Sequence, residues 1–198
     1  MPIHPLESQA IARICHDLIS PIGAIGNGIE LLSLISPATP ELDLIAQSAA
    51  AAQHKVNFFR IAFDCARPSA VLTGIEFAQT AQNMFEAARL RVTITTPCPD
   101  LPRDDARLLF LLMLCAETAL PLGGQLKVQS DGAGWLLVAH GRRVALEPVH
   151  WGHLEHGANA GESSAARVHF PLARHALEEG PRKFSYETSE TSLTLRLS

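Results

Sequence analysis

The sequence predicts an α+β fold in which an antiparallel helical hairpin precedes a mixed α/β domain. Two observations lead to this prediction. Through the first third of the chain, aliphatic residues recur every three or four positions, which is the period of an amphipathic helix. From about residue 70 the pattern changes to short β-branched runs that alternate with helical segments. In a chain of 198 residues we therefore expect two domains, residues 1–68 and residues 69–198.

The first predicted helix begins near residues 5–8 and ends near Ile35. Its apolar stripe comprises Ile11, Ile14, Leu18, Ile22, Ile25, Ile29 and Leu32. Each helical residue turns by about 100°, so His16 lies roughly 140° from the centre of this stripe. His16 is therefore expected to face solvent. The residues that share its face are Ser20, Gly23 and Asn27.

A second helix is expected from about Glu41 to Ala66. Residues 36–40 interrupt the first helix. Thr39 can cap the second helix, and Pro40 suits its first turn because the missing N–H needs no partner there. The two helices are expected to run antiparallel.

Two helices cannot cover this apolar surface by themselves. Full burial of the stripe is worth on the order of 10–20 kcal/mol, as an upper bound, and leaving it exposed would create an adhesive surface. A second copy of the hairpin would complete a four-helix bundle. We therefore predict a homodimer through residues 5–66. The alternative is that the hairpin packs on the second half of its own chain.

The second domain is expected to alternate helices and strands. Thr73 and Glu76 form a capping box that opens a helix reaching about Leu90. The segment 131–134, Asp-Gly-Ala-Gly, is typical of a tight turn in a hairpin. The other predicted elements are a strand over 91–96, an apolar helix from Asp104 or Asp105 to before Pro121, paired strands over 125–130 and 135–140, a helix over 163–179, and strands over 183–188 and 192–197.

The segment from His16 to Leu32 reads HDLISPIGAIGNGIELL. It combines a His-acid pair, a proline five residues after the histidine, and Gly-Ala and Asn-Gly at fixed spacings. This pattern resembles the phosphoacceptor segment of two-component dimerisation and phosphotransfer domains, in particular the ChpT-type histidine phosphotransferases of alphaproteobacteria. The resemblance implies that the second domain is a Bergerat-type α/β sandwich, the ATP-binding fold of histidine kinases. The alternative is that His16 is a surface histidine on a core helix.

The resemblance implies a function in a multistep phosphorelay. His16 would accept a phosphoryl group from a receiver aspartate of a CckA-like hybrid kinase and pass it to CtrA-like or CpdR-like response regulators. Asp17 would fix the imidazole tautomer, or would be surface charge only. The receiver would bring its own Mg²⁺, and this chain is expected to bind no cofactor.

Candidate receiver-docking residues lie on both helices of the hairpin. They are Arg13, Ser20, Gly23, Asn27, Phe59 and Arg60. In an antiparallel hairpin with its turn near Pro37, the Phe-Arg pair lies level with His16. The following Asp64 stands where the family pattern implies glycine. The glycines at 23, 26 and 28 cost roughly 2–3 kcal/mol of helix propensity, which indicates a docking role or close packing in the dimer.

The motifs of a working kinase are missing. Residues 107–119 contain no asparagine for Mg²⁺, and Glu117 alone cannot assemble a metal site. No Asp-x-Gly-x-Gly motif follows the strand at 135–140, and Gly157 and Gly161 do not match a phosphate lid. We therefore expect no phosphorylation from ATP. The alternatives are a diverged ATP-dependent histidine kinase and a non-catalytic adaptor that binds receivers.

Composition excludes several other classes of function. The net charge is −4 with no basic stripe, which argues against nucleic acid as a partner. The first residues lack a secretory pattern, and the apolar run 108–116 is too short to span a bilayer. The 4 cysteines form no CxxC pair and are expected to be reduced. We expect a soluble, cytoplasmic protein without a membrane partner.

Two other constellations were weighed and disfavoured. Cys15 and His16 are adjacent on a helix and diverge by about 100°, which disfavours a thiol–imidazole dyad. His150, His153 and His156 do not all share one helical face, which disfavours a zinc site. Trp135 and Trp151 are expected to be core residues.

Overall fold

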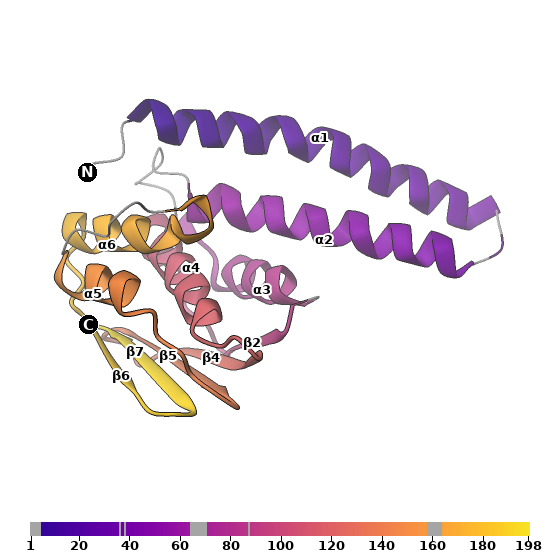
Figure 1. Ribbon diagram of the computed structural model, residues 1–198. Helices are drawn as coiled ribbons and strands as arrows, with labels where there is room; N and C mark the ends of the chain where they lie inside the picture. Colours follow the sequence, from indigo (N-terminus) through magenta and orange to yellow (C-terminus); the bar gives the residue numbers. More distant parts are fainter. Residues whose placement is uncertain (1–4, 36, 38, 64–70, 87, 158–163) are drawn as a thin grey trace.

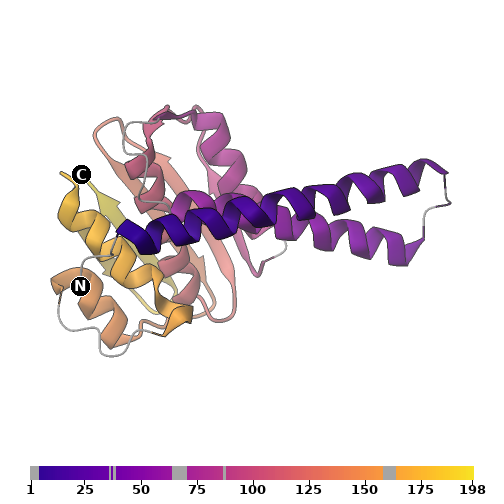
Figure 2. The same cartoon turned by 90° about the horizontal axis from the view of Figure 1, so that it is seen from above.

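A long hairpin of two helices is joined to an α/β domain (Figure 1). The computed structural model describes residues 5–35, 37, 39–63, 71–86, 88–157 and 164–198, with side chains from Ala10 onward. The hairpin consists of α1 (Pro5–Ile35) and α2 (Pro40–Ala62). Seen from above, the first half of α1 lies over the α/β domain, and the turn of the hairpin projects away from it (Figure 2).

The hairpin confirms the predicted cap and corrects one boundary. The Thr39 hydroxyl accepts a hydrogen bond from the Leu42 backbone N–H at 3.2 Å, and Pro40 occupies the first turn of α2. The helix ends at Ala62, with Phe63 as its C-cap, rather than at Ala66. Asp64 and the predicted boundary at residue 68 lie outside the described residues.

The α/β domain contains the remaining elements. They are β1 (Val71–Leu72), α3 (Gly74–Phe85), β2 (Leu90–Ile94), β3 (Leu101–Pro102), α4 (Arg103–Thr118), β4 (Gly124–Ser130), β5 (Trp135–Gly141), α5 (Pro148–His156), the 3₁₀ turn η1 (Ala165–Arg167), α6 (His169–Glu179), β6 (Phe184–Thr188) and β7 (Ser192–Leu197). The main sheet has the order β2-β4-β5-β7-β6. Only β2 and β4 are parallel in it, and α4 connects them. Helices α3, α4 and α6 lie on one face of this sheet (Figure 1).

Several sequence predictions for this domain are confirmed. The capping box is present, because Thr73 and Glu76 bond each other's backbone N–H groups. The hairpin of β4 and β5 turns over 131–134, where Asp131 Oδ1 accepts from the backbone N–H groups of Ala133 and Gly134. Both tryptophans are buried.

Other predictions for this domain are wrong in detail. Helix α3 ends at Phe85 instead of about Leu90, because Leu90 is buried as the first residue of β2. Helix α5 was not predicted. The helix expected over 163–179 is η1 followed by α6, and Pro171 lies in the first turn of α6, where it removes no helical hydrogen bond. The two-residue strands β1 and β3 were also missed.

The end of α2 belongs to the same hydrophobic core as the α/β domain. Phe58, Ile61 and Ala62 are buried in one cluster with Phe77 and Phe85. The Phe58 and Phe85 rings meet edge to face, with centroids 5.8 Å apart. The hairpin is therefore anchored at this end, whereas its turn extends beyond the body of the molecule.

The first half of the hairpin leaves apolar surface uncovered. Ile14, Leu18, Ile25 and Leu32 are between 45% and 59% exposed in the single chain. By length and composition alone, the Ala10–Ile35 part of α1 could cross a membrane, and it has a mean hydropathy of 1.6. The sequence prediction rested on the contiguous apolar run at 108–116 and missed this stretch, whose apolar residues are interrupted by polar ones. Helices that pack against other helices in soluble proteins have the same composition.

Candidate functional site

His16 lies on α1 with 80% of its side chain exposed. Its Nδ1 atom is 3.2 Å from Oδ1 of Asp17. The other carboxylate oxygen, Oδ2, accepts a hydrogen bond from Nε of Arg13 at 2.8 Å. All three side chains come from little more than one turn of a single helix, so this arrangement needs no other element to assemble it.

The charge state of Asp17 determines the direction of these hydrogen bonds. The hydrogen bond from His16 lowers the pKa of Asp17, and the positive charge of Arg13 acts in the same direction. Asp17 is thus an ionised carboxylate at neutral pH and can only accept hydrogen bonds. His16 must then donate from Nδ1, which leaves the lone pair of Nε2 pointing to solvent. Nε2 is therefore the nucleophilic atom of the exposed ring.

A groove runs between α1 and α2 on the side of His16. Its volume is about 640 Å³. On α1 it is lined by Ile19, Ile22, Gly23, Gly26, Asn27, Ile29 and Glu30, and on α2 by Ala46, Ala49, Ala50, Gln53 and His54. Two of the predicted docking residues, Gly23 and Asn27, thus line one groove. Ser20 is exposed on the same face of α1 but is not among the lining residues.

The glycines of α1 make no close packing contact with the residues that the structure describes. A Cβ atom added at Gly23, Gly26 or Gly28 would meet no atom within 4 Å. Their cost in helix propensity therefore has no intramolecular compensation. This leaves the two explanations outside the chain, a docked partner or a second copy.

The two candidates on α2 lie in different surroundings. Phe59 is half-buried and stacks on Phe63, with ring centroids 5.2 Å apart. Arg60 is exposed, and its backbone carbonyl accepts a hydrogen bond from Arg103 at 3.4 Å. Arg60 follows the groove residue Gln53 by seven positions, so it lies on the groove side of α2.

The uncovered apolar residues of α1 lie on the opposite side from His16. At about 100° per residue, the centre of Ile14, Leu18, Ile25 and Leu32 is roughly 180° around the helix from His16. Cys15, in contrast, is buried, which separates its thiol from the exposed imidazole. The hairpin therefore has one face with the exposed imidazole of His16 and a groove, and one face with exposed aliphatic side chains.

The segments expected to bind ATP in a histidine kinase contain different residues in this chain. Helix α4 is apolar and buried along almost its whole length, and Glu117 lies at its end, where burial raises the pKa of the carboxyl. The nearest imitation of an Asp-x-Gly-x-Gly loop is the β4–β5 turn. Within the described ranges, no three His, Cys, Asp or Glu side chains come together to hold a metal ion.

Comparison with known proteins decides the family. Residues 75–192 match the family model of the histidine phosphotransferase C-terminal domain. The chain belongs to the histidine phosphotransferase family. It is 34% identical over 148 residues to protein phosphotransferase ChpT of Brucella abortus (strain 2308), a match that covers 72% of this chain and 71% of that protein.

Solved structures agree with this assignment. A bacterial phosphotransferase determined at 1.7 Å superposes with a TM-score of 0.73 and 27% identity, covering 100% of this chain and 98% of the other. The histidine kinase domain of a blue-light-activated kinase from Erythrobacter litoralis EL346 gives a TM-score of 0.44 at 13% identity, covering 96% of this chain and 93% of the other. The family resemblance expected from the segment at His16 is thus confirmed, and the predicted order of a helical hairpin followed by an α/β domain is shared with the solved phosphotransferase.

One feature of the site was missed at the level of sequence. The ion pair of Arg13 and Asp17 was not predicted, although oppositely charged residues four apart on a helix are neighbours. The four-residue separation of Arg13 and Asp17 in the sequence would have been enough to predict this ion pair.

Proposed function

We propose that this histidine phosphotransferase is a phosphorelay intermediate with His16 as its phosphoacceptor. The observation that carries the proposal is the exposed imidazole whose Nδ1 donates to an ionised Asp17, leaving Nε2 free. The phosphoryl donor would be a CckA-like hybrid-kinase receiver, and the acceptors would be CtrA-like or CpdR-like response regulators. The receiver would supply Mg²⁺, and this chain would bind no cofactor.

The transfer step needs little chemistry from this chain beyond positioning. A bond forms between Nε2 of His16 and phosphorus as the bond between phosphorus and the receiver's aspartyl oxygen breaks. The aspartyl carboxylate leaves with the electron pair. The proton on Nδ1 stays in the hydrogen bond with Asp17, whose negative charge balances the positive charge that develops on the ring.

The groove supports a docking role for Gly23 and Asn27, which line it. Arg60 would contribute from the same side of α2, seven residues after the groove residue Gln53. The proposed occupant is a surface helix of the receiver, since the groove is long, partly apolar and free of side chains at the glycines. Arg13, Ser20 and Phe59 would border this contact. Arg60 would pair with a carboxylate of the receiver.

We further propose that two copies pair through the hairpin as a four-helix bundle. The exposed aliphatic side chains of α1 point away from His16, so pairing would bury them without covering the site. A soluble, cytoplasmic dimer that binds neither nucleic acid nor membrane would account for the apolar composition of α1. Because α4 lacks asparagines and no Asp-x-Gly-x-Gly motif follows β5 in the sequence, we propose that this chain does not use ATP.

The test is transfer from a phosphorylated receiver domain, with Mg²⁺ and no ATP, to the wild-type protein and to His16→Ala. His156→Ala is the matched control, because His156 is also an exposed histidine. Acid-labile label is expected on the wild type and on His156→Ala only. Label on His16→Ala would rule out His16 as the acceptor.

Two further results would favour the alternative functions. Labelling of the wild type by [γ-³²P]ATP without any receiver would favour a diverged kinase. Receiver binding with no label from any of a broad receiver panel would favour a non-catalytic adaptor.

A further inference from the structure

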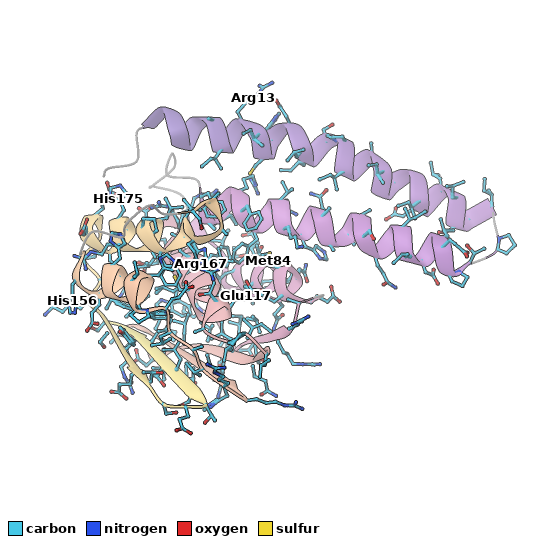
Figure 3. The ribbon with its side chains drawn as sticks, in the orientation of Figure 1. Arg13, Met84, Glu117, His156, Arg167 and His175 are labelled. Atoms are coloured by element: carbon cyan, nitrogen blue, oxygen red, sulfur yellow. The ribbon has the colours of Figure 1, made fainter. Side chains whose placement is uncertain are left out.

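We infer that Arg13 is a positioning residue for phosphotransfer at His16, acting through Asp17; this inference rests on the proposed function. The guanidinium Nε of Arg13 donates to Oδ2 of Asp17 at 2.8 Å, while Oδ1 of the same carboxylate lies 3.2 Å from His16 Nδ1. Arg13 therefore engages one oxygen of Asp17 and leaves the other oriented toward the imidazole. Figure 3 shows Arg13 projecting from the side of α1 that faces away from α2.

Stability of the helix does not explain the pair. The side chains of Arg13 and Asp17 are 74% and 50% exposed, and exposed ion pairs contribute little to folding. The basic residue also precedes the acidic one, which is the weaker order for a pair four residues apart. What the pair does determine is geometry, because an ion pair at 2.8 Å restricts the rotamers of Asp17.

That geometry matters for His16 because the ring is otherwise unrestrained. Most of the imidazole surface is exposed, and Asp17 is its only hydrogen-bond partner among the described residues. Without a fixed carboxylate, the ring would rotate freely and would shift toward the tautomer with hydrogen on Nε2, in which the attacking lone pair is lost. By fixing Asp17, Arg13 thus favours the His16 tautomer with hydrogen on Nδ1, in which Nε2 keeps its lone pair.

Kinetics separate this role from direct docking. A positioning residue changes the limiting transfer rate at saturating receiver, whereas a docking residue changes the receiver concentration at half-maximal rate. We expect Arg13→Gln to lower the limiting rate about twofold to fivefold. Because Arg13 also borders the proposed receiver contact, the half-maximal concentration should change too, but by a smaller factor. Arg13→Lys should restore most of the rate, and Arg91→Gln, an exposed arginine on β2, is the matched control for loss of charge.

A double-mutant cycle makes the path through Asp17 explicit. In an Asp17→Asn background, Arg13→Gln is expected to cause no further loss of rate, because the group it acts on is gone. Equal losses from Arg13→Gln in both backgrounds would overturn the inference. So would an effect confined to the half-maximal receiver concentration, which would assign Arg13 to docking alone.

The ring tautomer gives a readout that needs no partner. In ¹⁵N-histidine spectra of the full-length protein, His16 is expected to carry its hydrogen mainly on Nδ1, and Arg13→Gln should raise the fraction with hydrogen on Nε2. An unchanged tautomer ratio would contradict the inference even if transfer occurs. If the expected ratios are found but no receiver transfers phosphate, the proposed function fails and the positioning geometry stands.

Discussion

The ring of Phe58 on α2 stacks on the ring of Phe110 on α4, with centroids 4.5 Å apart and planes inclined by 28°. Both side chains are fully buried. This contact joins the hairpin to the α/β domain, so the helix pair that carries the groove has a rigid base. The α/β domain thus has a structural role in supporting the hairpin.

Removing this contact should destabilise the whole chain. Phe58→Ala is expected to lower the free energy of unfolding by about 3–5 kcal/mol, because it leaves a cavity among aromatic rings. Denaturant titration followed by circular dichroism measures this. Ile75→Ala, at a residue that is 72% exposed, is the control and should change stability by less than about 0.5 kcal/mol. A loss below about 1 kcal/mol for Phe58→Ala would show that the two parts fold independently.

Gly23→Ala should have opposite effects on stability and on receiver binding. Within the described part of the chain the added methyl group meets no atom within 4 Å, so the helix should gain about 0.5–1 kcal/mol. The same methyl would project into the groove and should raise the half-maximal receiver concentration roughly tenfold. Gly28→Ala, roughly 140° around the helix, is the control for propensity alone. Equal transfer kinetics for both variants would remove Gly23 from the docking surface.

Ile25→Glu should separate the proposed dimer. Ile25 is 53% exposed in the single chain and lies on the face away from His16. A carboxylate buried between two copies would be desolvated without a partner, so the dissociation constant of the dimer should increase by more than tenfold. Light scattering after size exclusion would then report the single-chain mass of 21.4 kDa. Ala24→Glu on the outer side of α1 is the control, and a monomeric wild type at micromolar concentration would refute the dimer.

His169 should give the protein an acid-sensitive stability. Burial lowers the pKa of His169 from 6.5 to about 4, and the charges of Arg167 and His150 act in the same direction. Between these two values the unfolded chain binds the additional proton, so stability should fall as the pH decreases from 6.5 to 4, by about 3 kcal/mol at most.

His169→Leu should remove this dependence. Nε2 of His169 is buried and has no hydrogen-bond partner among the residues that the structure describes, so an apolar replacement should not lower stability at pH 7. The measurement is the difference between the wild-type and variant unfolding free energies across the pH range. A difference that does not change with pH would mean that the pKa of His169 is the same in the folded and the unfolded chain.

The elements that sequence predicted well are those with local chemical signals. The period of α1, the Thr73–Glu76 capping box and the Asp131 turn each depend on residues a few positions apart. Helix α5 had such signals too, with Pro148 in its first turn and Gly157 at φ 66° as its C-cap, but its nine residues carry few apolar side chains. The two-residue strands β1 and β3 form only because distant segments meet.

For the site, the sequence predicted candidate residues but not their arrangement. The spacing after His16 was enough to predict the family and the face of the helix. The link from Arg13 to Asp17 depends on which rotamers the side chains adopt, and the groove depends on where α2 lies against α1. Docking partners lie in other chains, so no periodicity in this one can identify them.

His16 and the exposed aliphatic side chains lie on opposite sides of α1, and this determines how many receivers one dimer could bind. In the proposed dimer the two acceptor histidines would point outward on opposite flanks of the bundle. Each could then engage its own receiver without steric interference from the other. The His16 of one copy could accept a phosphoryl group from a donor receiver while the His16 of the other copy transfers its phosphoryl group to an acceptor. A single dimer would then carry out both half-reactions at the same time.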